Sequence, residues 1–364
     1  MPSQRNNLNK KHNRLLYLAF EQAKINLGST KSNPSVGCID EKDDTVLSSG
    51  VTSFNGRPHA EFNALNKNKD FKKASLYVTM EPCCHFGKTP PCTRIIIKKK
   101  IGKIFFASKD FDPRTKNKLK KTLKKNKIYI KNISLKQYTK NFYGSYSLQH
   151  SLNLPLIDAK IAITNDYFTK HKKQKWISGY NSRKVAHLLR SMYDCLISTS
   201  KTINNDNAIL DCRIEGLERK SPDLVIIDRN LTLKNNLKIF QKKLKRKIIV
   251  FTLSKNKKKI NKLKKKGVIL FNLKSLTNKN DYKDLFLFLK RLKYSRIFLE
   301  SGITFLNFLI KEKFINNIYI FKSNNRLNKL GINYSNSNII KKIILKNLIN
   351  VNLFGDKLYK EKLK

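Results

Sequence analysis

The sequence is poor in acidic residues. Its 364 residues include 25 Asp and Glu against 77 Lys and Arg, so the formal net charge at pH 7 is +52. Two explanations stay open. Clustered Lys and Arg bind phosphate backbones and anionic surfaces, but Lys, Asn and Ile are abundant throughout this chain, as a composition bias alone would make them. We favour composition and expect no specific nucleic-acid partner, although the positive field still attracts phosphorylated substrates.

Long hydrophobic runs and a disulfide framework are also missing. No run of about 18 apolar residues is available to span a bilayer, and the first residues lack the apolar segment of a signal peptide. The cysteines lie at positions 38, 83, 84, 92, 195 and 212. They lack the regular spacing that is typical of small, disulfide-bonded secreted domains. These absences predict a soluble cytoplasmic protein with no membrane attachment.

One stretch, residues 58–93, carries a metal-binding pattern. It reads P-H-A-E at 58–61 and P-C-C-H at 82–85, with another thiol at Cys92. One imidazole, from His59, and two thiolates, from Cys83 and Cys92, suit Zn²⁺. Three protein ligands leave the fourth tetrahedral position open, as in catalytic zinc sites. Glu61, two residues after His59, is placed to carry protons without joining the ligands, as in zinc deaminases.

Two neighbouring side chains compete for roles in this site. Cys84 is an alternative ligand, but adjacent side chains diverge and Cys83 is the one directly after the proline. His85 as a fourth ligand would close the site and make it structural. We favour His85 as a substrate contact. Each fragment of the pattern is common by chance, whereas the whole set in this order indicates a catalytic zinc site.

The spacing of the two thiols resembles one deaminase family. G-K-T-P-P at 87–91 makes the interval from Cys83 to Cys92 longer than the C-x-x-C of nucleoside and nucleic-acid deaminases, and similar to that of the riboflavin-pathway deaminase. N-P-S-V-G-C at 33–38 resembles the N-P-x-V-G-C of the same family, and A-S-K-D at 107–110 resembles its later substrate loop. The resemblance implies one Zn²⁺ per chain.

The length allows two domains, each with a core of its own. We predict a zinc-dependent pyrimidine deaminase domain over residues 1–148, in which helices and strands alternate. This order predicts a cytidine-deaminase-like, three-layer sandwich of helices around a sheet. Helices are expected up to about residue 26, from 59 past 65, and over 93–100 and 115–125. Strands are expected at 35–39, 45–49, 75–79 and 103–107, with a turn at Asp43-Asp44.

A second domain is predicted over residues 153–364, after an ambiguous stretch at 135–153. Its strands and helices alternate as in an α/β domain with a mainly parallel sheet. No G-x-G-x-x-G follows a strand, so the sequence does not support an ordinary Rossmann dinucleotide site. Strands are expected at 156–164, 195–198, 224–227, 247–251, 268–271, 296–299 and 318–321, helices at 182–193, 281–292 and 304–313, and a lysine-rich loop at 255–259.

This second half is similar to the reductase domain fused to the deaminase in bifunctional riboflavin enzymes, which has a dihydrofolate-reductase-like fold and uses NADPH. The resemblance implies cofactor contacts from Ala162, Trp176, Thr202, Asp206, Gly302, Ile303 and Thr304. It implies substrate contacts from Gln174, Arg190, Leu210, Arg213 and Glu300. Guanidinium groups bind ribose phosphates bidentately, and a glycine before a helix lets the backbone approach a cofactor phosphate.

We therefore expect a bifunctional enzyme, a zinc hydrolase and an NADPH-dependent oxidoreductase. Its expected substrate is the phosphorylated pyrimidine ribotide 2,5-diamino-6-ribosylamino-4(3H)-pyrimidinone 5′-phosphate. The reductase half departs from the family at Asp166-Tyr167 and at Asp206-Asn207-Ala208. These departures leave open a deaminase whose second domain is an inactive structural or binding partner. The positive charge and the same zinc chemistry leave open a nucleic-acid deaminase of the tRNA-editing kind, although the thiol spacing argues against it. The sequence leaves both a monomer and a homo-oligomer open.

Overall fold

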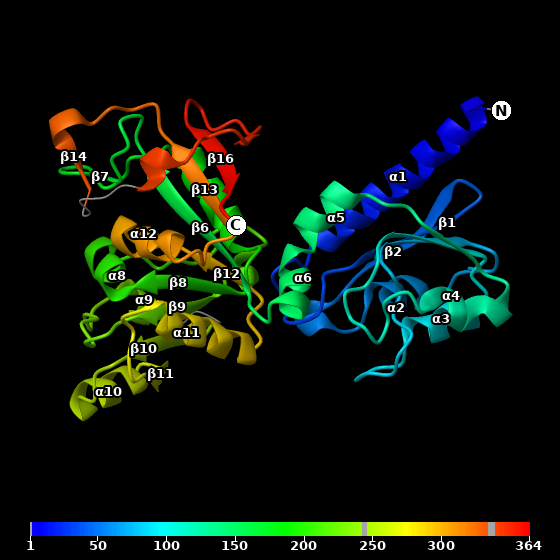
Figure 1. Ribbon diagram of the computed structural model, residues 1–364, viewed down its shortest axis with the longest axis horizontal. Helices are drawn as coiled ribbons and strands as arrows, with labels where there is room; N and C mark the ends of the chain where they lie inside the picture. The colour runs from blue at the N-terminus through cyan, green and yellow to red at the C-terminus, as the bar shows by residue number, and fades with distance from the viewer. Residues whose placement is uncertain (1, 242–245, 334–338) are drawn as a thin grey trace. The chain divides into compact units, whose positions relative to one another are not determined.

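The computed structural model describes residues 2–241, 246–333 and 339–364. The chain divides into two compact units, Met1–Leu154 and Pro155–Lys364 (Figure 1). In the described residues, no helix combines the length and the apolar character needed to cross a membrane.

The first unit is built on a five-stranded sheet. Its elements are α1 (Pro2–Lys24), β1 (Gly37–Lys42), β2 (Thr45–Val51), α2 (Ala60–Leu65), β3 (Ser75–Met80), α3 (Cys92–Lys98), β4 (Lys103–Ser108), α4 (Leu119–Leu123), β5 (Tyr129–Asn132), α5 (Lys136–Phe142) and α6 (Gly144–Ser151). The strand order is β2-β1-β3-β4-β5. Strand β1 is antiparallel to β2 and β3, whereas β3, β4 and β5 are parallel.

Two glycines let helices approach this sheet on opposite faces. A Cβ on Gly37 would lie 1.8 Å from the carbonyl oxygen of Ala19 in α1. A Cβ on Gly50 would lie 2.2 Å from the carbonyl oxygen of Ala60 in α2. Helix α1 therefore packs against one face, and α2, with α3 and α4 beside it, covers the other (Figure 1). The predicted three-layer sandwich is confirmed.

The hairpin between β1 and β2 forms where the sequence predicts it. Asp43 and Asp44 are its two central residues, and both have left-handed backbones, with φ of 51° and 61°. A two-residue turn with positive φ at both positions matches the right-handed twist of the strands, and Asp is one of the residues that tolerate it. The predicted helix over 115–125 is shorter, because residues before Leu119 form turns and Asn117 has φ of 62°.

Strand β1 carries a buried acid, Asp40, beneath α2. Ser48 Oγ lies 2.7 Å from Asp40 Oδ2 and 2.9 Å from the carbonyl oxygen of Ala64. A hydroxyl has one proton, so if Ser48 donates to the carbonyl, the contact with Asp40 needs a proton on the acid. Burial raises the pKa of Asp40 from 3.8 to about 7 against the lowering effect of Ser48. Burial therefore favours the protonated form of Asp40 over a wider pH range than in an exposed aspartate.

We expect Asp40→Asn to flatten the pH dependence of stability in this unit. The native state keeps a proton on Asp40 that the unfolded chain loses above pH 3.8, so its stabilising effect is lost as the pH rises towards about 7. A shift of this size corresponds to roughly 4 kcal/mol. Hydrogen exchange of the β1 and β2 amides between about pH 5 and pH 8 measures the opening of this region. Parallel profiles for the variant and the wild type would contradict the assignment.

The second unit is an α/β domain. Its elements are β6 (Leu156–Ile163), β7 (Lys170–His171), α7 (Tyr180–Arg190), β8 (Cys195–Thr199), α8 (Ser200–Asp206), β9 (Asp223–Ile227), α9 (Lys238–Gln241), β10 (Ile248–Thr252), α10 (Lys257–Lys264), β11 (Val268–Asn272), α11 (Lys279–Arg291), β12 (Arg296–Leu299), α12 (Ile303–Lys311), β13 (Asn317–Lys322), β14 (Gly331–Ile332), β15 (Leu348–Ile349) and β16 (Lys357–Lys362).

The main sheet of this unit has the strand order β11-β10-β9-β8-β12-β6-β13-β16-β15. All neighbours from β11 to β13 are parallel, and β16 and β15 add an antiparallel edge. The prediction of a mainly parallel sheet is confirmed. Parallel strands bring their carboxyl ends to one edge, where ligands bind in open α/β sheets. The segments after β8 and β12 therefore begin at the same edge.

One local prediction in this unit is wrong. Of the lysine-rich stretch assigned to a loop at 255–259, residues 257–259 form the start of helix α10, while 255 and 256 precede the helix. The side chain of Asn256 caps the helix by accepting the backbone N–H of Lys259 at 3.0 Å. Lysine has good helix propensity, and Leu263 buries its side chain in the core. A capping residue and one buried side chain are enough to stabilise this short helix. The run of lysines had suggested an exposed loop instead.

Candidate active sites

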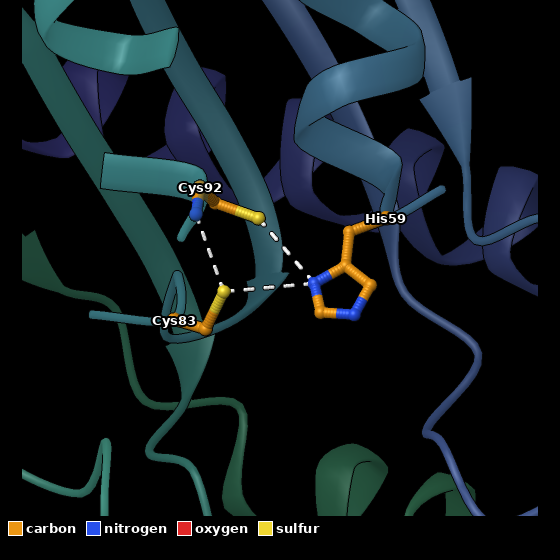
Figure 2. Close-up of side chains that lie close together, drawn as sticks. All are labelled: His59, Cys83 and Cys92. Carbon is orange, nitrogen blue, oxygen red and sulfur yellow. Dashed lines mark hydrogen bonds between the residues drawn. The ribbon is translucent and has the colours of Figure 1, made fainter. Parts of the chain in front are cut away.

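Three segments of the first unit bring the predicted metal ligands together (Figure 2). His59 is the N-cap residue of α2, Cys83 lies in the loop after β3, and Cys92 is the first residue of α3. One ligand atom from each residue lies within 4.8 Å of the others. Two helix N-termini thus meet at the site, and their positive ends favour anionic ligands such as thiolates.

The spacing of these atoms fits a tetrahedral zinc ion. Cys83 Sγ and Cys92 Sγ lie 3.6 and 3.4 Å from His59 Nδ1. Zinc bonds of about 2.3 Å to sulfur and about 2.0 Å to nitrogen place S and N roughly 3.5 Å apart at a tetrahedral angle. The chain therefore supplies three ligands in suitable positions and leaves room in the ligand set for water or substrate.

The surroundings favour a thiolate at Cys83. The thiol of Cys92 donates to it and lowers its pKa, and His59 adds to this effect, while burial acts in the opposite direction. The backbone N–H of Cys92 also donates to Cys83 Sγ, at 3.2 Å. A thiolate is the form of cysteine that binds metal.

Glu61 lies in the first turn of α2, next to the ligand group. Its side chain is buried, and burial raises its pKa to about 7, with the Cys83 thiolate adding to the rise. A carboxyl group whose pKa is near the working pH both accepts and donates protons readily. Glu61 is thus a suitable general acid/base that does not belong to the ligand group.

Cys84 and His85 lie outside the group of metal ligands. The Cys84 thiol contacts the carbonyl oxygen of Pro82 at 3.5 Å, and burial raises its pKa to about 11. His85 Nδ1 lies 2.9 Å from Thr115 Oγ1. Across the described residues, His59, Cys83 and Cys92 form the one group of this kind close enough to hold an ion.

Two residues near the site were not selected from the sequence. Buried Glu81 accepts backbone N–H groups from residues 110, 117 and 119, and so organises the loop that follows β4. Arg57 donates to Thr89 in the long segment between the two thiols, and its guanidinium lies close to Gly87. In the sequence, the place of Glu81 directly before the P-C motif could have drawn attention to it. No sequence pattern distinguishes Arg57.

In the second unit, two predicted cofactor residues meet where β8 and β12 end. The backbone N–H of Gly302 donates to Thr202 Oγ1 at 3.0 Å. A Cβ on Gly302 would meet only this hydroxyl within 4 Å, so the backbone is open to a ligand. Ile303 and Thr304 form the first turn of α12, the former buried and the latter exposed. The N-terminus of a helix is suited to phosphate oxygens.

Three charged residues cluster beside this turn. Arg190 forms two hydrogen bonds with buried Glu300, Nε to Oε1 at 2.5 Å and a terminal nitrogen to Oε2 at 3.0 Å. Lys160 Nζ lies 3.9 Å from Glu300 Oε2. Burial lowers the pKa of Lys160. Burial also raises the pKa of Glu300, but the charge and hydrogen bonds of Arg190, together with the charge of Lys160, bring it below its usual value. The guanidinium of Arg190 thus has an internal carboxylate partner.

The other predicted contacts differ in exposure. Leu210 is buried, with a left-handed backbone at φ of 59°, and Arg213 extends into solvent beside Asp211, at 3.2 Å. Ala162 is half-buried near the end of β6. Gln174 and Trp176 lie in the exposed loop between β7 and α7. Asp206 ends α8, where burial raises its pKa and the charges of Lys170, Lys175 and Lys160 act against that rise.

Known proteins are similar to this chain over most of its length. The riboflavin biosynthesis protein RibD of Aquifex aeolicus is 33% identical over 307 residues, which are 84% of each chain. This chain belongs to the RibD family. The RibD of Buchnera aphidicola is 30% identical and covers 83% of this chain and 84% of its own.

Family models and solved structures match both halves. The cytidine and deoxycytidylate deaminase zinc-binding region matches residues 9–108, and the RibD C-terminal domain matches residues 155–323. One structure of RibD from Acinetobacter baumannii is 26% identical, with a TM-score of 0.82, and covers 97% of this chain and 98% of its own. A Thermotoga maritima deaminase/reductase, 24% identical with a TM-score of 0.81 over 97% of this chain and 99% of its own, shares the fold.

RibD is a bifunctional enzyme of riboflavin biosynthesis, with a deaminase and a reductase activity. The prediction of this family, its fold and its two activities is confirmed, as are zinc and NADPH as the cofactors that it implies. The alternative of a nucleic-acid deaminase is not supported.

Proposed function

We propose that this RibD protein first deaminates 2,5-diamino-6-ribosylamino-4(3H)-pyrimidinone 5′-phosphate and then reduces the ribosyl group of the product. The observation that carries the first step is the ligand group of His59, Cys83 and Cys92 with Glu61 beside it. These ligands would hold Zn²⁺, which supplies the Lewis acidity that makes water a nucleophile at neutral pH.

Glu61 would move the protons of the deamination. In the hydrolysis, water adds its oxygen to the amine-bearing carbon, and ammonia leaves with the electron pair of the broken C–N bond. Glu61 first accepts a proton from the attacking water and then donates it to the departing nitrogen. A raised pKa suits both directions, because neither protonation state is strongly favoured. Burial of Glu61 also keeps bulk water from exchanging this proton.

The turn after β12 would hold the cofactor of the second step. NADPH, when bound, supplies a hydride for the ribosyl carbon. We assign Gly302, Thr304 and Thr202 to its binding, because an open backbone and a hydroxyl meet there. Ala162, Trp176, Asp206 and Ile303 keep their proposed cofactor roles from the family resemblance.

The charged cluster beside this turn would hold the sugar. We propose that Lys160 and Glu300 orient the ribosyl hydroxyls, and that Arg190 fixes Glu300 by its two hydrogen bonds. Exposed Arg213 is then the better candidate for the substrate phosphate, since its guanidinium reaches solvent. Gln174 and Leu210 remain proposed substrate contacts. We also propose a cytoplasmic location, in line with the cysteine pattern.

Ammonia release from different amines tests the proposed substrate class. We expect ammonia from the diaminopyrimidine ribotide but not from cytidine nucleotides or single-stranded RNA, because the segment between Cys83 and Cys92 differs from the C-x-x-C of deaminases that act on those substrates. The protein is assayed with zinc and without NADPH, so that only the first step proceeds. Release from RNA and not from the ribotide would contradict the proposal.

A further inference from the structure

A buried histidine holds the start of the loop that carries Trp176. His171 is the last residue of β7 and is 7% exposed. Its Nδ1 accepts two backbone N–H groups, from Lys173 at 2.9 Å and from Gln174 at 2.8 Å. Both donors lie in the loop between β7 and α7, so one ring nitrogen fixes the first bend of the loop.

The ring acts here as Asn, Asp or Ser side chains do in a turn. Those side chains accept backbone N–H groups two and three residues ahead, which is the spacing from His171 to its two donors. A ring nitrogen that accepts two N–H groups carries no proton, so the proton of the neutral ring is on Nε2. Strand β14 secures the residue itself, because Gly331 pairs with His171 and Lys172 donates its N–H to the carbonyl of Leu330 at 2.9 Å.

A second contact holds the far end of the same loop. The guanidinium carbon of Arg183, in α7, lies 5.0 Å from the centroid of the Trp176 ring. Arg183 also donates to the carbonyl of Ser178 at 2.7 Å. Lys175 Nζ also lies 5.2 Å from the centroid of this ring, and Trp176 is nevertheless 54% exposed, so a ligand can reach it. The loop is thus fixed at both ends around an available aromatic surface.

The loop also adjoins the proposed cofactor site. Lys170 and Lys175, on either side of the bend, are close enough to Asp206 for their charges to act on its pKa. Lys160, which lies against Glu300, acts on Asp206 as well. The bend held by His171 therefore lies next to residues assigned to cofactor and sugar.

We propose that His171 is a positioning residue for NADPH binding, which orders the loop so that Trp176 and Gln174 stand ready before the cofactor arrives. This inference rests on the proposed cofactor role of Trp176. A loop that is ordered in advance loses less conformational freedom on binding, and this raises affinity without any new contact. His171 itself touches neither cofactor nor substrate in this account.

Titration with NADPH tests the proposal, because Trp176 is the single Trp of the chain and its fluorescence reports on the loop. In the full-length protein, His171→Leu removes the acceptor, and we expect about a tenfold higher Kd and KM for NADPH with little change in kcat. His171→Asn restores an acceptor at the same spacing, and we expect a Kd close to that of the wild type. Ammonia release should be the same in all three proteins.

Unchanged NADPH affinity in His171→Leu, or equal losses in the Leu and Asn variants, would overturn the proposal. The variant Trp176→Leu tests the cofactor role of Trp176 separately from the positioning role of His171. Its binding of NADPH is followed by the fluorescence of NADPH itself. If that variant binds NADPH normally, the cofactor role of Trp176 is wrong and the inference falls with it. If it binds weakly while His171→Leu binds normally, only the inference is wrong.

A measurement on the wild type covers the case in which His171→Leu does not fold. We expect slow hydrogen exchange at the amides of Lys173 and Gln174, since both are bonded to the ring although their side chains are exposed. Exchange of both amides at the rate of an unstructured chain would contradict an ordered bend and overturn the proposal.

Discussion

Glu61→Gln is expected to lower the rate of ammonia release by about 10² to 10⁴-fold while zinc stays bound. The amide keeps the shape of the side chain and one hydrogen-bonding oxygen, but it cannot carry a proton from water to the departing nitrogen. Because the three metal ligands are untouched, metal analysis should still find one zinc per chain. Steady-state ammonia release from the ribotide measures the loss.

The same variant separates the two activities. The residues proposed for reduction lie in the second unit, so Glu61→Gln supplied with already deaminated ribotide should oxidise NADPH at close to the wild-type rate. A zinc-loaded, folded variant that loses both activities would show that the two steps do not use separate sites. Deamination at the wild-type rate would show that another group carries the proton.

Cys83→Ser is expected to abolish zinc binding and, with it, deamination, whereas Cys84→Ser should leave both nearly unchanged. Cys83 Sγ lies 3.6 Å from His59 Nδ1, while the Cys84 thiol contacts a backbone carbonyl instead. Serine is a far weaker zinc ligand than a thiolate, and loss of a ligand from a three-residue set removes most of the affinity. The two variants are a matched pair, because the same substitution is made at two adjacent cysteines.

Zinc content after dialysis against a weak chelator distinguishes the two variants. Circular dichroism of each variant controls for folding, and NADPH oxidation with deaminated ribotide controls for the second unit. Equal zinc loss in Cys84→Ser and Cys83→Ser would overturn the assignment of the ligands.

The sequence predicted most of the first unit because its elements depend on local patterns. The turn at Asp43-Asp44 and the order of helices and strands follow from neighbouring residues. The three ligands are separated in sequence, yet each one is fixed by a proline or by the start of a helix. The support of the loop by Glu81 could not be predicted, because it depends on backbone N–H groups more than 25 residues away in the chain.

The reductase half was harder to predict in detail. Its strands are visible as apolar runs, but the partner of a charged side chain is set by the packing of distant strands and helices. Arg190 was expected to contact the substrate, and the sequence did not show that it also pairs with Glu300, 110 residues away in the chain. The role of His171 was hidden for a different reason, since a lone histidine in a sequence gives no indication of which nitrogen will accept a hydrogen bond.

The central claim is that one chain carries out two successive reactions on one ribotide. It is tested most directly by following ammonia release and NADPH oxidation together in a single reaction with the diaminopyrimidine ribotide. Ammonia should appear first and NADPH oxidation should follow, until the two amounts are equal. Ammonia release with no NADPH oxidation, by a protein whose second unit is folded, would contradict the claim and make that unit a structural partner of the deaminase.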